Sequence, residues 1–210
     1  MVFKEKPWQI RLAVLIRKIL FNFYEKLNFV KKDTISLEEV KNILIIRTDR
    51  LGDAVVTTPL IKAIKELFPD KKLYVLCSKQ NEIIFKQNPY IDEVFSIDVS
   101  PWLNYSYVKI PIWGSFLNCA YSLFYHFKDR EIISVLKLLK AKDIDVVFDA
   151  VGRKRTAIIA KYLGKFTIGP KLSEVIFLYD CFSDSIWVND LSQEHIVERY
   201  FDTFFKAIKS

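Results

Sequence analysis

The chain has 210 residues, a formal net charge of +7 and 51% hydrophobic residues. This hydrophobic content excludes a disordered chain, and five glycines with seven prolines exclude a collagenous or low-complexity one. Two histidines exclude a multi-histidine metal site, and three cysteines without C-x-x-C spacing exclude a zinc ribbon and a disulfide framework. We therefore expect one folded domain in a reducing, cytoplasmic setting, with any catalysis carried by carboxylates.

Residues 4–26 combine a long apolar stretch with basic residues. Arg11, Arg17 and Lys18 interrupt the stretch well before the ~20 uncharged residues that a membrane-spanning helix needs. On a helical wheel Arg11 and Lys18 share one face and the apolar residues line the other, while Arg17 departs from this pattern. Two interpretations remain: a helix lying among lipid headgroups with its basic face toward anionic lipid, or an extra helix packed on the core.

The next part of the chain alternates apolar runs with helical periodicity. Strands alternating with helices in this way predict an α/β fold with a parallel sheet and right-handed crossovers. In chain order, the pattern predicts a strand over 42–47, a turn over 48–53, a helix over 54–68, a strand over 73–77, a short helix over 81–87 and a strand over 94–97.

The alternation stops at about residues 100–127, where nine Trp, Tyr and Phe side chains are concentrated. We interpret this stretch as an insertion whose aromatic residues either meet a membrane or ligand or simply fill the core. Regular structure then resumes. The pattern predicts a helix over 129–140, a strand over 145–149, a helix over 156–163, a short strand over 166–168 and a final helix near 192–209.

Two loops are candidate sites, because ligands of open α/β sheets bind at the carboxyl ends of the strands. The first loop contains Asp49, Arg50, Gly52 and Asp53. Asp53 falls at the expected helix start, where its carboxylate either caps the helix or faces a ligand. The loop has neither G-x-G-x-x-G nor a P-loop motif, which argues against a nicotinamide or P-loop enzyme.

The second loop follows residue 149 and combines Gly152 with Arg153, Lys154 and Arg155 at the start of a helix. Guanidinium groups and a helix N-terminus both bind carboxylate or phosphate. A solvated basic cluster is the more frequent explanation for three adjacent charges. The position of this cluster beside a strand end favours an anion-binding role.

Several segments together resemble the heptosyltransferase family of glycosyltransferases, the ADP-heptose:lipopolysaccharide enzymes. They are ILIIRTDRLGDAVVTTP at residues 43–59, IKELFP at 64–69, DVVFD and the residues after it at 145–169, and EHIVERY at 194–200. The resemblance covers about residues 41–209. It implies the N-terminal half of a GT-B architecture, with a Rossmann-like parallel sheet that has helices on both faces and binds the acceptor. The donor-binding domain is expected to be absent from this chain.

The resemblance also assigns roles. Asp53 matches the catalytic general base, which takes a proton from the acceptor hydroxyl as configuration inverts at the donor sugar. Arg155 matches a position that contacts an acidic acceptor. Neither a cofactor nor a metal is implied, and the donor is a nucleotide-sugar resembling ADP-heptose. Ala150 and Val151 stand where the family often has Leu-Gln. The predicted substrate-binding residues are Arg50, Gly52, Thr57, Arg153, Lys154 and Arg155.

The expected function is therefore inverting sugar transfer to a lipopolysaccharide-core or other lipid-linked glycan, by a protein peripheral on the inner face of the cytoplasmic membrane. The expected partners are this acceptor, the membrane surface and a donor-binding domain or subunit. Residues 1–40 form the expected helix and connector, and residues 41–210 the acceptor-binding domain. The alternative is a non-catalytic, membrane-associated binding or scaffold domain. Nucleic acid is not expected as a partner, because no recognised motif accompanies the positive charge.

Overall fold

The computed structural model describes residues 35–99, 129–170, 186–188 and 196–209. The expected amphipathic helix over 4–26 and nearly all of the aromatic insertion lie outside these ranges. No helix within them has both the length and the apolar character needed to cross a bilayer.

The described elements alternate between strands and helices, as predicted. In chain order they are β1 (Ile35–Ser36), η1 (Leu37–Glu39), β2 (Asn42–Arg47), α2 (Leu51–Leu67), β3 (Lys72–Ser78), α3 (Glu82–Lys86), β4 (Glu93–Ile97), α6 (Arg130–Lys140), β5 (Val146–Asp149), α7 (Lys154–Leu163), β6 (Phe166–Pro170), β7 (Ile186–Val188), α9 (Ile196–Ala207) and β8 (Ile208–Lys209).

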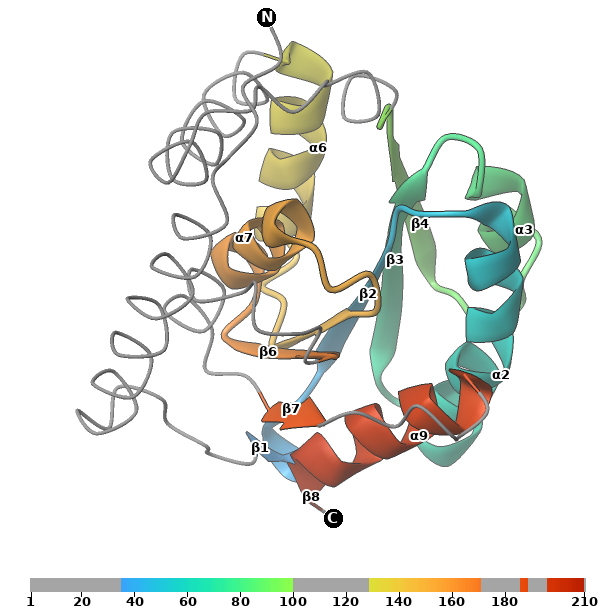
Figure 1. Ribbon diagram of the computed structural model, residues 1–210. Coiled ribbons are helices and arrows are strands. Elements are labelled where there is room, and N and C mark those ends of the chain that lie inside the picture. Colours follow the sequence, from blue (N-terminus) through green and yellow to red (C-terminus); the bar gives the residue numbers. More distant parts are fainter. Residues whose placement is uncertain (1–34, 100–128, 171–185, 189–195, 210) are drawn as a thin grey trace, which may run out of the picture.

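Six of the strands form one parallel sheet in the order β4-β3-β2-β5-β6-β7, and helices cover both of its faces (Figure 1). The strand β2 lies at the centre, where Ile46 pairs with Leu76 of β3 and with Asp149 of β5. The chain builds the sheet outward from β2 in one direction through β4, and then in the other from β5. The α/β class and the parallel sheet predicted from the sequence are thereby confirmed.

The side chains of β2 alternate between two hydrophobic clusters, one on each face of the sheet. Ile43 and Ile45 pack with α2 and α9, whereas Leu44 and Ile46 pack with α6 and α7. All four are fully buried. A central strand covered on both faces requires such a continuous apolar run, which is why the sequence located it.

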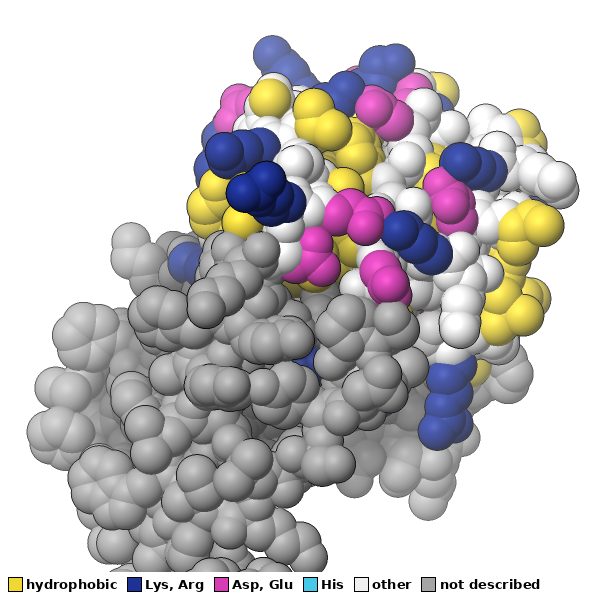
Figure 2. All heavy atoms as spheres, turned by 90° about the horizontal axis from the view of Figure 1, so that it is seen from above, with side chains coloured by type: hydrophobic (Ala, Val, Ile, Leu, Met, Phe, Trp, Pro, Cys, Tyr) yellow, Lys and Arg dark blue, Asp and Glu magenta, His cyan; other side chains and the backbone are white. Residues whose placement is uncertain are grey.

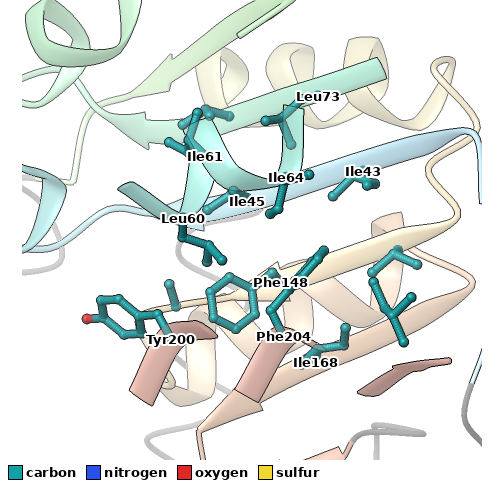
Figure 3. Packing of buried hydrophobic residues seen from close by; sticks show 14 of the residues in the cluster. Ile43, Ile45, Leu60, Ile61, Ile64, Leu73, Phe148, Ile168, Tyr200 and Phe204 are labelled. Atoms are coloured by element: carbon teal, nitrogen blue, oxygen red, sulfur yellow. The ribbon is translucent and has the colours of Figure 1, made fainter. Parts of the chain in front are cut away.

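The helix α9 closes one face of the sheet with aromatic rings. The ring of Phe148 on β5 meets those of Tyr200 and Phe204 edge-on, at centroid distances of 6.2 and 5.7 Å. Such edge-to-face pairs add to the stabilisation from burial alone. In Figure 3 the hydroxyl of Tyr200 points away from the other labelled side chains of this cluster.

At the amino-terminal edge of the sheet, Asp92 is saturated with hydrogen bonds. Its carboxylate accepts from the Leu73 backbone N–H at 2.8 Å, from Lys65 Nζ at 2.7 Å and from Lys72 Nζ at 3.0 Å. Burial on its own raises the pKa of Asp92, but these donors outweigh it and lower the pKa to about 2. The carboxylate thus ties the start of β3 to the loop before β4.

Asp145 does the same at the start of β5. One carboxylate oxygen accepts from the backbone N–H groups of Lys41 and Asn42, at 2.9 and 3.0 Å, and the other from Lys165 Nζ at 2.9 Å. Burial opposes ionisation, yet these hydrogen bonds prevail and lower the pKa of Asp145. This edge of the sheet is therefore bound together by ionised carboxylates.

Several element boundaries differ from the sequence prediction, and the strand β7 was not predicted. The helix α2 begins at Leu51 rather than at residue 54, because Gly52 continues the helix instead of making the expected tight turn. The helix α7 begins at Lys154 rather than at residue 156. The sequence also missed β1 and β8, which pair Ile35 with Ile208 and so include residues before 40 in the folded unit.

Candidate functional site

The strand order of the sheet reverses between β2 and β5. From β2 toward one side of the sheet the strands follow in the order β2, β3, β4. From β5 toward the other side they follow in the order β5, β6, β7. Ligands of open α/β sheets bind outside the carboxyl ends of the strands at such a switch point. The loops after Arg47 and Asp149, which the sequence singled out, start from these two adjacent strand ends.

The first loop leads directly into α2. Arg50 is the residue before the helix, has an extended backbone and makes no side-chain hydrogen bond that caps it. Gly52 and Asp53 lie in the first helical turn, and the side chain of Asp53 is partly exposed. Within the described residues no side-chain hydrogen bond caps this helix start, and the ligand-facing role of Asp53 stays a prediction.

Gly52 faces open space. Apart from its two chain neighbours and the backbone of its own helix, no described atom lies within 4 Å of a Cβ atom added to Gly52, so packing does not require glycine here. Thr57 differs, because it is fully buried and its hydroxyl donates to the Asp53 carbonyl at 2.7 Å. That hydroxyl stabilises the helix, and a substrate contact for Thr57 stays a prediction.

Arg47 is the residue here that the sequence reading missed. Its side chain is only 1% exposed, and its Nη1 donates to Asp49 Oδ2 at 2.9 Å. On its other side the guanidinium lies 4.7 Å from the ring centroid of Tyr200. The sequence did contain an indication of this role. An arginine at the end of a strand that is buried on both faces must either place its charge at the ligand-binding edge of the sheet or bury that charge.

Charges at this edge influence one another. Burial raises the pKa of Asp49, Arg47 opposes that shift, and the negative charge of Asp53 raises the pKa further. Burial likewise raises the pKa of the Tyr200 hydroxyl against the opposing charge of Arg47. Seen down this edge of the sheet, the described surface carries acidic and basic side chains next to one another (Figure 2).

The second loop is held by the carboxylate of Asp149. Its Oδ1 accepts from the backbone N–H groups of Val151 and Gly152, both at 3.1 Å, and its Oδ2 accepts from the Thr156 hydroxyl at 2.8 Å. Gly152 has a φ of 68°, a left-handed conformation that strongly favours glycine. Asp149 is thus the structural centre of the loop, a role that the sequence reading did not assign.

The basic residues of this loop stand at the start of α7. Arg153 is exposed immediately before the helix, its backbone N–H donating to Thr156 Oγ1 at 3.1 Å, and Arg155 is partly exposed. Lys154 begins the helix. The Ala150 N–H donates to the Ile46 carbonyl at 3.2 Å, which joins this loop to the end of β2. The predicted residues of both loops therefore occupy one edge of the sheet.

The chain resembles known proteins in sequence and in fold. No protein-family model matches the chain. Lipopolysaccharide heptosyltransferase 3 of Escherichia coli K12 is 24% identical over 154 residues, which are 70% of this chain and 37% of that protein. The resemblance to heptosyltransferases predicted from the sequence is thereby confirmed.

Solved structures show the same fold. A family 9 glycosyl transferase from Veillonella parvula superposes with a TM-score of 0.58 at 19% identity, covering 80% of this chain and 41% of that one. The heptosyltransferase WaaC of E. coli with ADP gives 0.57 at 19% identity, covering 79% and 46%. The fold predicted for one half of such glycosyltransferases is thus confirmed, and the chain spans less than half the length of these relatives.

Proposed function

We propose that this chain supplies the acceptor-binding side and the general base of an inverting glycosyl transfer. The donor is a nucleotide-sugar resembling ADP-heptose, and the acceptor is a lipopolysaccharide-core or other lipid-linked glycan. Residues 41–210 serve as the acceptor-binding domain, and a donor-binding domain or subunit completes the site. The similarity to a lipopolysaccharide heptosyltransferase and to a heptosyltransferase that binds ADP supports this proposal.

The placement of Asp53 carries the proposal. Its carboxylate lies in the first turn of α2, at the end of the central strand and beside the switch point of the sheet. The helix N-terminus favours a negative charge there. The Asp53 side chain is partly exposed and the adjoining Gly52 faces open space, and both features support an approach of the sugar hydroxyl from this side.

In the proposed reaction, the acceptor hydroxyl oxygen attacks the anomeric carbon of the donor sugar. A carbon–oxygen bond forms on one face of the sugar while the bond to the leaving phosphate breaks on the other, which inverts the configuration. The hydroxyl proton passes to Asp53. A sugar hydroxyl is a weak nucleophile, and a positioned base of this kind contributes about 10²–10⁴-fold to the rate.

The second loop is proposed to hold the acidic groups of the acceptor. Arg153 and Arg155 stand at the N-terminal end of α7, where the helix adds partial positive charge. Guanidinium groups bind carboxylate or phosphate through paired hydrogen bonds. We assign Lys154 and Arg50 the same supporting role because they lie at the same edge.

Substitution of Asp53 by asparagine tests the proposal, since it keeps the size of the side chain and removes the base. Transfer from ADP-heptose to purified lipopolysaccharide core is measured for the chain within the polypeptide or complex in which the cell makes it. We expect kcat to fall about 10²–10⁴-fold. Asp70→Asn is the matched control, because Asp70 is an exposed carboxylate beyond the other end of α2. Unchanged transfer by Asp53→Asn would refute Asp53 as the general base, and a parent protein without any transfer would favour the scaffold alternative.

We also propose that the protein works at the inner face of the cytoplasmic membrane, where a lipid-linked acceptor is available. The basic and apolar residues of segment 4–26 support this proposal. The expected result is co-sedimentation with vesicles of anionic phospholipid that weakens with added salt. Replacing both Arg11 and Lys18 by glutamine should abolish it, and binding that survives this change would refute the assignment to this segment.

A further inference from the structure

Among the residues that the structure describes, five buried polar atoms have no hydrogen-bond partner, and all five lie at the carboxyl-terminal edge of the sheet. Within the described residues they are Arg47 Nε and Nη2, Asp49 Oδ1, Ser78 Oγ and Asn81 Oδ1. Each has lost hydration without gaining a protein partner in return, so the group destabilises the fold relative to apolar side chains of similar size. A buried polar cluster left in this state calls for an explanation other than stability.

The same side chains determine the path of the first loop. Asn81 Nδ2 donates to the backbone carbonyl of Asp49 at 3.0 Å and reaches that of Arg47 at 3.4 Å. The ion pair between Arg47 and Asp49 spans the same two residues through their side chains, at 2.9 Å. Two sets of interactions, the Asn81 hydrogen bonds and the Arg47–Asp49 ion pair, therefore fix the backbone on either side of Thr48, immediately before the turn into α2.

Arg47 also connects this loop to the distant helix α9. Its guanidinium packs on the ring of Tyr200, and that planar, permanently charged group suits ring packing and an ion pair at the same time. Asp53 follows this loop in the first turn of α2, and its negative charge raises the pKa of Asp49. One side chain thus links the central strand, the first loop and α9.

We propose that Arg47, acting with Asp49, is a positioning residue for Asp53. The pair holds the first loop so that the Asp53 carboxylate faces the acceptor hydroxyl, and the fold gives up stability to maintain this geometry. The inference rests on the proposed function, in which Asp53 is the general base. An ion pair that served stability alone would have its hydrogen-bonding atoms satisfied, as those of Asp145 are.

The test is the double variant Arg47→Met with Asp49→Asn, which removes both charges and leaves no lone buried ion. We expect an unchanged or higher denaturant midpoint. We expect kcat to fall about ten- to hundredfold with the KM for the donor within about twofold, because a misplaced base impairs the chemical step rather than donor binding. The Ala54 amide, which donates to the Arg50 carbonyl, should exchange its hydrogen about tenfold faster as the loop loosens.

The matched control is an ion pair at the opposite edge, in the variant Lys165→Met with Asp145→Asn. Its midpoint should fall while kcat is unchanged. If the double variant at Arg47 and Asp49 behaves like this control, or if its midpoint falls together with kcat, the pair is structural and the inference is wrong. Asp53→Asn is assayed alongside. Full activity of that variant refutes the proposed function, whereas its inactivity with a parental kcat at Arg47→Met/Asp49→Asn refutes only the positioning role.

Discussion

The amino-terminal edge of the sheet and the first loop at its carboxyl-terminal edge treat buried charge in opposite ways. At the amino-terminal edge, Asp92 and Asp145 are surrounded by donors and have lowered pKa values. At the carboxyl-terminal edge, the pKa of Asp49 is raised and five buried polar atoms of the described chain lack partners. The first arrangement stabilises the fold, and we propose that the second maintains the position of Asp53 at the expense of stability. Proteins commonly leave buried polar groups without hydrogen-bond partners at functional sites, although they pair such groups elsewhere.

The largest expected effect at the amino-terminal edge comes from Asp145→Ala. The change leaves the backbone N–H groups of Lys41 and Asn42 without their acceptor and removes one of the two carboxylate partners of Lys165, the other being Asp143. We expect unfolding in urea to require about 3 kcal/mol less free energy, since unsatisfied buried donors are costly. The activity of the folded variant should be unchanged. A loss below about 1 kcal/mol would mean that this edge does not secure the fold.

A pair of glycine substitutions sharpens the comparison. A Cβ atom on Gly164, just before β6, would lie 2.6 Å from Val147 Cγ2, whereas one on Gly52 would meet nothing. We expect Gly164→Ala to destabilise by about 2 kcal/mol through overpacking. Gly52→Ala should leave stability within about 0.5 kcal/mol or raise it slightly, because alanine favours the helix.

The KM for the acceptor should distinguish the two glycine variants in the opposite sense to stability, with the larger effect at Gly52. If the acceptor occupies the open space at Gly52, the added methyl group of Gly52→Ala should raise the KM for the acceptor although the fold is intact. Gly164→Ala should leave that KM unchanged in the folded fraction. Thermal melting and acceptor titration measure both quantities. An acceptor KM unaffected by Gly52→Ala would place the acceptor elsewhere on this edge.

The free energy of unfolding, plotted against pH, should have slopes of opposite sign for Asp92 and Asp49, which lie at the two edges. The folded pKa of Asp92 is about 2, below the 3.8 of an unperturbed aspartate, so its contribution of about 2 kcal/mol is present above pH 4 and disappears toward pH 2. The pKa of Asp49 is raised in the folded state, so stability is lost as the pH rises through that pKa. Asp92→Asn should flatten the first slope and Asp49→Asn the second, in unfolding measured between pH 2 and 7.

The smallest effect is expected at Cys77, a buried thiol on β3 beside the first loop. Burial raises its pKa to about 12, so the reactive thiolate is scarce at neutral pH. In a chain with serine at positions 119 and 181, labelling by a thiol reagent should occur only as fast as global unfolding. Faster labelling would show that the carboxyl-terminal edge opens locally, and the Arg47→Met/Asp49→Asn variant should then label faster still.

Local patterns predicted the parts of the fold that depend on neighbours in sequence. The apolar run at Asn42–Arg47 was located to the residue, because a central strand must be apolar on both faces. Pairs of residues far apart in the chain were not predictable. Nothing in the sequence near Arg47 indicates that Tyr200 lies under its guanidinium, and strands of two residues such as β1 are too short to show a period.

The candidate site was predicted unevenly for a related reason. Asp53 and the basic second loop were found because they lie in contiguous motifs next to strand ends. The role of Asp149 was missed, because the sequence pattern of a carboxylate at a strand end is the same whether the side chain binds a ligand or the backbone of its own loop. Thr57 was predicted to bind substrate from its position in a motif, whereas its burial depends on how α2 lies against the sheet.

The short pairing of β1 with β8 makes this unit suitable for circular permutation. Ile35 and Ile208 lie side by side at the end of the molecule away from the first loop (Figure 1). A linker of a few residues can therefore join the two ends without crossing the site, and new termini can be opened at the exposed Asp70. The order in which the chain is synthesised would change while the surroundings of Asp53 stayed the same.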